Sequence, residues 1–224
     1  MLVDADFRFI HEEFYTDRVT PGQLDLLLAD GWRHFGEHFF RYNVGLYEDE
    51  IRRVLPLRIR LADFKLSKSQ RRTIRKNADL VTQISPIQIS NDTNELFERH
   101  RSRFKSGAPQ TLYDFLSLDP SGIPTPGFEL RVHNGGSLVA ASFFDVGLAS
   151  VSSIYGMFDP DLAGRGLGIF TMLKEIEFAQ SLSKQFYYHG YAYEGSSFYD
   201  YKKRFSALET YDWKSGWHSL SPDF

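Results

Sequence analysis

Residues 149–180 of this 224-residue chain read ASVSSIYGMFDPDLAGRGLGIFTMLKEIEFAQ, and this stretch decides the fold. It predicts a buried strand, a short loop that contains Gly164, Gly166 and Gly168, and then a helix. Glycines lack the Cβ atom that would hold a ligand away from the backbone. The first turn of a helix presents unpaired N–H groups and the positive end of the helix dipole. The stretch therefore predicts a site for a phosphate-bearing ligand.

Both flanks of this stretch predict sheet strands. A meander of three strands precedes the loop, and the helix after it is expected to be amphipathic. A strand at 186–188 follows, and a right-handed crossover would place it beside the last meander strand if the two are parallel. The meander strands are expected at residues 128–133, 137–145 and 150–157. The apolar stripe of the helix, expected over 168–182, comprises Ile169, Met172, Leu173, Ile176 and Ala179.

Two helix starts are marked by capping residues in the N-terminal half. Thr20 before Pro21 predicts a helix that Gly31 ends. Ser67 to Gln70 has the S-x-x-Q form of a capping box and opens a helix through about Asn77. The other expected elements are strands at 36–42, 54–61, 80–89 and 208–213, a connection at 48–53, helices at 91–104, 110–118 and 198–205, a loop at 119–127, and a tail over the last eleven residues.

The composition limits the class of protein. With 42% hydrophobic and 25% charged residues the chain is typical of globular proteins, and without cysteine it has no disulfide or thiolate metal site. Apolar runs too short for a membrane span and a charged N-terminus predict a cytoplasmic protein with no membrane partner. Between Ile51 and Lys76, ten basic residues face Asp63 alone, a charge of +9 in a chain whose net charge is −3. This segment predicts a polyanion partner.

The loop resembles the central motif of the GNAT acyltransferase superfamily, Q/R-x-x-G-x-G/A. In that motif, backbone amides hold the pyrophosphate of an acyl-coenzyme A. Gly166 and Gly168 match its two glycines, whereas Ala163 replaces its leading Gln or Arg. The resemblance implies an α+β, GNAT-like acyltransferase fold with a mixed, mostly antiparallel central sheet flanked by helices.

A more specific resemblance runs from about residue 24 to 213 and concerns the aminoacyl-tRNA–protein transferase family. This family includes the arginyl-transferases and the bacterial leucyl-transferases of the N-degron pathway. Its members transfer an aminoacyl group from the 3′ end of a tRNA to the N-terminal amine of a protein. The matching blocks include Gly31-Trp32-Arg33, Phe39-Phe40-Arg41-Tyr42, Leu55-Pro56-Leu57-Arg58-Ile59, Phe64 to Arg72, Ser152-Ser153-Ile154-Tyr155, Phe158-Asp159-Pro160-Asp161, Lys174-Glu175-Ile176, Gly190-Tyr191 and Tyr201-Lys202.

Two departures from the family pattern concern regulation and the donor. The family carries a cysteine cluster for metal or iron–sulfur binding, one pair of it between the positions of Tyr42 and Leu55, where this chain has no cysteine. Redox regulation through a cluster is therefore expected to be absent, and no metal site is expected. The family's usual arginine near Ala163 is also missing, which leaves room for another acyl donor.

The resemblance assigns roles to several sets of residues. The basic block implies tRNA phosphate contacts from Lys68, Ser69, Gln70, Arg71, Arg72 and Arg75. The donor loop comprises Gly164, Arg165, Gly166, Leu167 and Gly168. The residues expected to bind the acceptor are Tyr201, Lys202 and Arg204.

Aminoacyl transfer needs a neutral amine, a group that stabilises the oxyanion, and a proton donor for the leaving hydroxyl. A backbone N–H on the strand before the loop, between Tyr155 and Phe158, is expected to hold the carbonyl. Tyr155, Glu194 and Tyr191 are the expected catalytic residues, with Glu194 as a base. Other bases that the sequence leaves open are His189 and Asp159, and other proton donors are Tyr193 and Tyr201.

Three functions follow from these features. The first is an aminoacyl-tRNA-dependent transferase, without cofactor, whose partners are aminoacyl-tRNA and a protein or peptide with a free amine, and not DNA. The second is an N-acyltransferase that uses acetyl-coenzyme A or another acyl-coenzyme A. The third is a non-catalytic tRNA-binding protein. Residues 1–53 are expected to form an N-terminal subdomain, and residues 54–224 the transferase domain.

Overall fold

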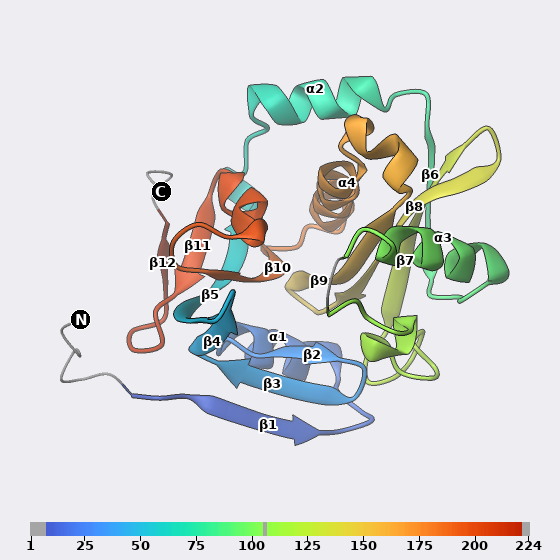
Figure 1. The fold of residues 1–224 in the computed structure, drawn as a ribbon. Helices are drawn as coiled ribbons and strands as arrows, with labels where there is room; N and C mark the ends of the chain where they lie inside the picture. The colour runs from blue at the N-terminus through green and yellow to red at the C-terminus, as the bar shows by residue number, and fades with distance from the viewer. Residues whose placement is uncertain (1–7, 105–106, 221–224) are drawn as a thin grey trace.

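A computed structural model describes residues 8–104 and 107–220, in which helices flank a nine-stranded, mostly antiparallel sheet (Figure 1). This confirms the mixed α+β class expected from the sequence. A separate three-stranded sheet has the order β1-β3-β2 and consists of β1 (His11–Tyr15), β2 (Arg33–Phe35) and β3 (His38–Tyr42).

The large sheet has the order β12-β11-β5-β10-β9-β8-β7-β6, and β4 pairs with β5 outside this path. Its strands are β4 (Val44–Tyr47), β5 (Glu50–Arg60), β6 (Val81–Pro86), β7 (Gly127–Asn134), β8 (Ser137–Val146), β9 (Ser150–Phe158), β10 (Phe186–Tyr193), β11 (Leu208–Tyr211) and β12 (Trp217–Ser219). The meander β7-β8-β9 is as expected, and β6, which ends at Pro86, lies at the edge of the sheet.

Helices cover both faces of the large sheet. The α-helices are α1 (Pro21–Ala29), α2 (Lys68–Lys76), α3 (Asn91–Arg101) and α4 (Leu167–Ser181). The short 3-10 helices are η1 (Leu61–Asp63), η2 (Leu112–Asp114), η3 (Pro160–Arg165) and η4 (Phe198–Arg204). The larger core forms between α4 and one face, and a second core forms under α3 on the other face. None of the described helices is long and apolar enough to cross a membrane.

The parallel pair β9–β10 is short. Phe186–Tyr188 pairs in parallel with Ser150–Ser152, as the sequence predicts, and the pairing ends there. An extra residue, Ile154, interrupts the register of β9 with β8, and another, His189, interrupts the register of β10 with β5. Such bulges bend a strand. The carboxyl-terminal halves of β9 and β10 therefore separate and leave an opening in the middle of the sheet.

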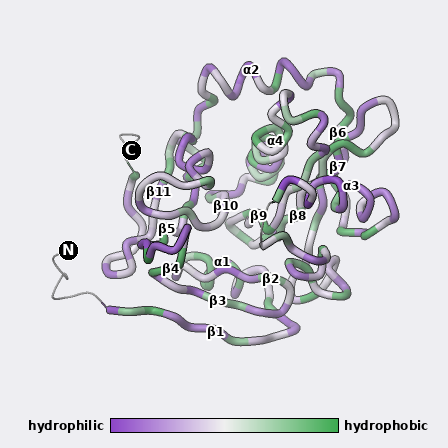
Figure 2. Tube along the Cα trace, viewed as in Figure 1, coloured by the Kyte–Doolittle hydropathy of each residue, from purple (hydrophilic) through white to green (hydrophobic). Residues whose placement is uncertain are grey.

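The helix α4 differs from the amphipathic helix that was expected. Eight of its fifteen residues are buried, and they include Thr171 and Glu175 as well as the apolar stripe. Ile169, expected on that stripe, is only half-buried. Figure 2 shows the contrast with α2, in which hydrophilic residues dominate. A helix this deeply buried places a carboxylate in the core, and the stripe alone did not reveal it.

Several other expected elements are wrong or shifted. Residues 48–53 are not a connection, because β4 and β5 form a hairpin there. The segment 110–118 holds only the short helix η2, and the helix expected at 91–104 ends at Arg101 and is capped by Ser90 with Thr93. The expected tail contains β12, while its residues 221–224 lie outside the described residues. The subdomain boundary expected after residue 53 falls inside β5, and the division stays a prediction.

A buried ion pair joins the small sheet to the large one. His34 on β2 lies 2.6 Å from Asp145 on β8, and each side chain is 3% exposed. The other ring nitrogen of His34 lies 2.9 Å from the carbonyl oxygen of Gly36. Both ring nitrogens of His34 therefore lie at hydrogen-bond distance from an oxygen. This pair is fully hydrogen-bonded and fixes how β2 packs over the opening.

Candidate active site

A cavity of about 790 Å³ occupies the opening between β9 and β10. It is lined from both faces of the sheet, by Gly166, Gly168 and Met172 at the start of α4 and by Phe35 and Phe40 of the small sheet. In open sheets, ligands bind at the carboxyl ends of parallel strands. The bulged pair thus places a binding site where two ligands can meet from opposite faces.

Only part of the expected donor loop reaches this cavity. Gly166 has a φ of +69°, caps α4 and lines the cavity together with Leu167 and Gly168. Gly164 and Arg165 do not line it. The Arg165 side chain turns to the end of α2, where it donates to Asn77 and to the carbonyl of Lys76. It is therefore a structural link and not a ligand of the cavity.

The basic helix α2 packs beside the start of α4. Thr73 of α2 lies 3.7 Å from where a Cβ of Gly166 would be, so α2 borders the cavity wall. Among the described residues, none of Lys68, Arg72 and Arg75 forms an ion pair, and all three are exposed, as is Arg71. The exposed face of α2 is thus an unneutralised cationic surface next to the cavity.

Two polar residues of the predicted phosphate set serve the helix instead. Gln70 is 5% exposed, and its Oε1 accepts from the backbone of Ser67. The hydroxyl of Ser69 lies 2.9 Å from that of Ser67, within the same cap. The capping box that predicted this helix therefore uses the side chain of Gln70.

Of the three expected catalytic residues, Tyr155 and Tyr191 line the cavity and Glu194 does not. The hydroxyl of Tyr155 is buried without a hydrogen-bond partner, and burial raises its pKa to about 12. Its ring stacks on that of Phe115 at 4.0 Å between centroids. Glu194 lies outside the cavity lining, with 59% of its side chain exposed. The structure does not bring Glu194 together with the residues that line the cavity, and its assignment as a base stays a prediction.

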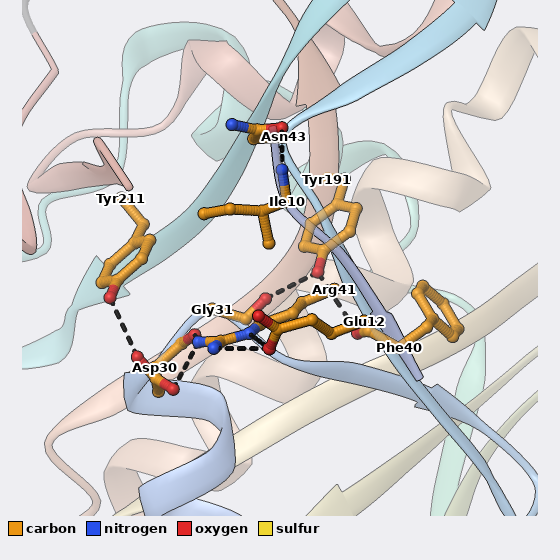
Figure 3. A network of polar contacts seen from close by, with 9 residues as sticks. All are labelled: Ile10, Glu12, Asp30, Gly31, Phe40, Arg41, Asn43, Tyr191 and Tyr211. Carbon is orange, nitrogen blue, oxygen red and sulfur yellow. Dashed lines mark hydrogen bonds and ion pairs between the residues drawn. The ribbon is translucent and has the colours of Figure 1, made fainter. Parts of the chain in front are cut away.

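The hydroxyl of Tyr191 is hydrogen-bonded to the backbone next to the small sheet and is not available as a proton donor (Figure 3). Its hydroxyl donates to the carbonyl of Gly31 at 2.6 Å, and burial raises its pKa well above the usual value. Nearby, Arg41 pairs with Glu12 and Asp30, so the surrounding turn is fixed by charge (Figure 3). Tyr191 contributes its ring to the cavity wall, and its assigned role as a proton donor is not supported.

The expected backbone donor on β9 is also partly occupied. The N–H of Phe158 donates to Nδ1 of His100, which lies on α3, at 3.0 Å. Burial lowers the pKa of His100, which favours the neutral ring that can accept this bond. The C-terminal end of β9 is therefore fixed by α3.

Two cations lie at the bottom of the cavity. Lys202, on η4, donates to the carbonyl of Tyr191 at 3.1 Å, and burial together with the charge of Arg33 lowers its pKa to about 7. Arg33 is 8% exposed and donates to Ser152 and to the carbonyl of Ser153. Gly190 adjoins both, because a Cβ there would be 3.0 Å from the Lys202 amine. Neither cation has a carboxylate within ion-pair distance among the described residues.

Of the other two residues expected to bind the acceptor, one lines the cavity and the other does not. Tyr201 lines the cavity, and burial raises its pKa to about 12. Arg204 is exposed and lies outside the cavity lining. Tyr201 and Lys202 are thus brought together with the loop, and Arg204 is not.

Sequence reasoning did not assign Arg33 and Glu175, which belong to the same cavity. Glu175 on α4 is 0% exposed, and its Oε2 accepts from the hydroxyl of Tyr187 at 2.8 Å. Arg33 comes from a strand whose alternation is too short to show a buried position. The family block Lys174-Glu175-Ile176 was the available signal for Glu175.

Comparisons with known proteins agree on a family. The family model described as "Arginine-tRNA-protein transferase, C terminus" matches residues 92–212. A protein of Stenotrophomonas maltophilia named aspartate/glutamate leucyltransferase is 32% identical over 92% of this chain and 84% of its own length. The chain belongs to the aminoacyl-tRNA–protein transferase family. A protein of the same name from Paramagnetospirillum magneticum is 35% identical over 75% of this chain and 70% of its own length.

Membership confirms the family resemblance seen in the sequence blocks and the aminoacyltransferase class of this enzyme. Solved structures resemble this transferase only distantly. L-PGS from Bacillus licheniformis is 14% identical over 83% of this chain and 55% of its own, with a TM-score of 0.48.

Proposed function

We propose that this transferase moves a leucyl group from leucyl-tRNA to the N-terminal amine of a protein whose first residue is Asp or Glu. The observation that carries the proposal is the cavity through the sheet, bordered on one face by a cationic helix and floored by two buried cations. The relatives named aspartate/glutamate leucyltransferase supply the amino acid and the acceptor class.

The donor side of the proposal is the α4 face. Exposed cations at Lys68, Arg72 and Arg75 suit the phosphates of an RNA arm, which bind by charge without reading sequence. No side chain caps the first turn of α4, so its N–H groups face the cavity mouth at Gly166. The terminal aminoacyl ester would then enter the cavity beside this turn.

The acceptor side is the floor of the cavity. A buried cation is costly unless an anion accompanies it, and neither Lys202 nor Arg33 has a carboxylate partner among the described residues. The carboxylate of an N-terminal Asp or Glu supplies that charge. Lys202 would bind it directly, because its amine is held toward the cavity by the carbonyl of Tyr191. Tyr201 lines the same wall.

The arrangement also supports a GNAT-like assignment of the fold. A strand, a glycine turn and a helix, followed by a strand that pairs in parallel with the first, is what the loop motif led us to expect. We propose that tRNA replaces coenzyme A in this site, so that no cofactor is needed. Arg165 is committed to α2 and gives a pyrophosphate no side-chain contact. Because the donor is charged tRNA, we expect the reaction to occur in the cytoplasm, without DNA or membrane.

The experiment is a transfer assay with a panel of charged tRNAs and four peptides that differ only in their first residue, Asp, Glu, Asn or Ala. We expect leucyl transfer to the Asp and Glu peptides and at least tenfold less to the Asn and Ala peptides. No transfer from any charged tRNA, together with no tRNA binding at low salt, would contradict the proposal. tRNA binding without transfer would leave the non-catalytic tRNA-binding function.

A thermal-shift measurement distinguishes the coenzyme A alternative. Any ligand that binds the folded state raises the melting temperature. We expect tRNA to raise it and acetyl-coenzyme A to leave it unchanged. The reverse result would favour an acyl-coenzyme A-dependent N-acyltransferase.

A further inference from the structure

Buried polar atoms without hydrogen-bond partners collect in the cavity wall. Among the described residues, they include Ser142 Oγ, Tyr155 OH, Glu175 Oε1 and His189 Nδ1, all from cavity-lining residues. Most buried polar groups in proteins are hydrogen-bonded, so unpaired ones that share a cavity mark where a ligand completes the bonding. One of these four atoms belongs to a carboxyl group.

Glu175 is the buried acid of this cavity. The other lining carboxylate, Asp114, is engaged elsewhere, because its Oδ2 accepts from the backbone of Gln110 in an exposed turn. The two oxygens of Glu175 differ in surroundings. Oε2 accepts from the Tyr187 hydroxyl at 2.8 Å, which fixes the carboxyl plane, whereas Oε1 makes no hydrogen bond of ordinary geometry, although the hydroxyls of Ser142 and Ser153 lie near the carboxyl group. A fixed carboxyl with one free oxygen is arranged to accept a proton from a ligand.

We propose that Glu175 is the general base of aminoacyl transfer, with Oε1 taking the proton from the attacking N-terminal amine. This inference rests on the proposed function. The amine nitrogen bonds to the carbonyl carbon of the ester as one of its protons moves to Oε1. The bond from that carbon to the ribose oxygen then breaks, and the proton held on Oε1 passes to the departing oxygen. Glu175 is thereby returned to its starting form.

The groups that face Glu175 come from each element packed against it. These are Arg33 from β2, Ser142 and Ser153 from β8 and β9, and Tyr187 from β10. His189 on β10 and Lys202 on η4 line the same cavity. Burial raises the pKa of Glu175 to about 7, although the three hydroxyls of Ser142, Tyr187 and Ser153 and the charge of Arg33 oppose this rise. A base whose pKa lies near the working pH is the most effective kind.

The neighbouring histidine is a poorer base. Burial, with the charge of Lys202, lowers the pKa of His189 to about 3, so the protonated ring that a base must become is disfavoured. Its Nε2 lies 3.0 Å from the carbonyl of Lys202, and its ring stacks parallel to that of Tyr187. His189 therefore acts as a neutral part of the wall.

The test compares wild type with Glu175→Gln and with Glu177→Gln in the transfer assay. Glu177 is the matched control on the same helix, with 69% of its side chain exposed and paired with Lys174. We expect Glu175→Gln to lower kcat about 100-fold or more with little change in the KM for tRNA, and Glu177→Gln to have no effect. The rise of wild-type kcat through pH 7 should disappear in Glu175→Gln.

Two further measurements separate a base from a structural acid. The solvent deuterium isotope effect on kcat reports a proton transfer in the rate-limiting step. It should be clearly larger in wild type than in Glu175→Gln. Tyr187→Phe removes the hydroxyl that lowers the pKa of Glu175. The acidic limb of the pH profile of kcat should therefore move to higher pH in this variant.

Wild-type inactivity with every charged tRNA would contradict the proposed function itself. An active wild type whose solvent isotope effect on kcat equals that of Glu175→Gln would overturn only the role of Glu175. An unmoved acidic limb in Tyr187→Phe would overturn it as well, and this variant decides the matter if Glu175→Gln does not fold.

Discussion

Two sets of buried charges in this protein differ in how completely they are satisfied. His34 and Asp145, between the two sheets, bond to each other and to a backbone carbonyl. Arg33, Glu175 and Lys202, in the cavity, have no partner of opposite charge within ion-pair distance among the described residues, and Glu175 keeps an oxygen unpaired. The first set is complete without a ligand, and the second is not. Satisfied charges therefore fix the fold here, whereas unsatisfied charges mark the site.

Breaking the complete pair should have the largest effect. His34→Leu leaves Asp145 as an unpaired buried charge, so we expect the free energy of unfolding to fall by about 3–5 kcal/mol. Chemical denaturation measures this. The double variant His34→Leu/Asp145→Leu should recover most of the loss because no charge is then left unpaired. A loss below about 1 kcal/mol in the single variant would show that the pair does not hold the sheets together.

The cavity charges should have the opposite effect on stability, beginning with Glu175. Its pKa is raised from 4.5 in the unfolded chain to about 7 in the folded one. The folded state therefore binds the proton more tightly, and stability falls as pH rises from about 4.5 to about 7, by roughly 3 kcal/mol. In Glu175→Gln this fall should be absent. Unfolding free energies at about pH 5 and about pH 8 for both proteins measure it, and an equal pH dependence would contradict the assignment.

Lys202→Met should reduce recognition of the acceptor without loss of stability. Removal of a charged hydrogen bond to an acidic side chain corresponds to about 1.5–3 kcal/mol, or roughly 10- to 100-fold in KM for an Asp peptide. The melting temperature of Lys202→Met should not fall, because the substitution removes the energetic cost of burying a cation. Since the free amine has a pKa of about 7, the wild-type KM for the acidic peptide should rise above pH 7 as that amine loses its proton.

The neighbouring exposed cation provides the control for Lys202. Arg204→Gln, outside the cavity, should leave the KM unchanged. Equal effects of the two variants would mean that long-range charge, and not a site on the cavity floor, attracts the acceptor.

Substitutions on the exposed helix α2 are expected to have the smallest effect per residue, and this effect is on tRNA binding. Arg72→Ala/Arg75→Ala should weaken tRNA binding and lower the slope of log affinity against log salt by about 0.7–0.9 for each phosphate that is no longer neutralised. Filter binding at several salt concentrations measures this, and Arg18→Ala, between β1 and α1, is the control. A slope unchanged from wild type would move the RNA-binding surface away from α2.

Capping residues and turn residues correctly predicted the elements whose ends they mark. Thr20 and Ser67 predicted the starts of α1 and α2, and both capping boxes form. The turn at Asn134-Gly135-Gly136 predicted the hairpin β7–β8. Segment 110–118 failed because its apolar residues face a core that only α3 and β8 create. A periodicity that is compatible with a helix does not fix one when packing decides.

In the candidate site, too, the residues marked by local signals could be predicted, and those that depend on packing could not. The basic residues of α2 and the glycines at the start of α4 could be predicted, because charge and backbone freedom are properties of short segments. Glu194 and Arg204 lie outside the cavity lining, whereas Glu175 and Arg33, which line it, were not assigned from the sequence. Burial depends on elements far away in the chain, and the bulges at Ile154 and His189 that open the cavity leave no local pattern.

The stretch at 149–180 by itself determined a strand, a glycine turn and a helix, because these follow from side-chain size and backbone freedom. The family followed from the order of sequence blocks along the chain. Tertiary structure alone decided which charges are buried without partners, because desolvation depends on everything packed around a group. It turned a loop expected to hold phosphate into one wall of a cavity whose floor is Lys202 and Arg33 and whose buried acid is Glu175.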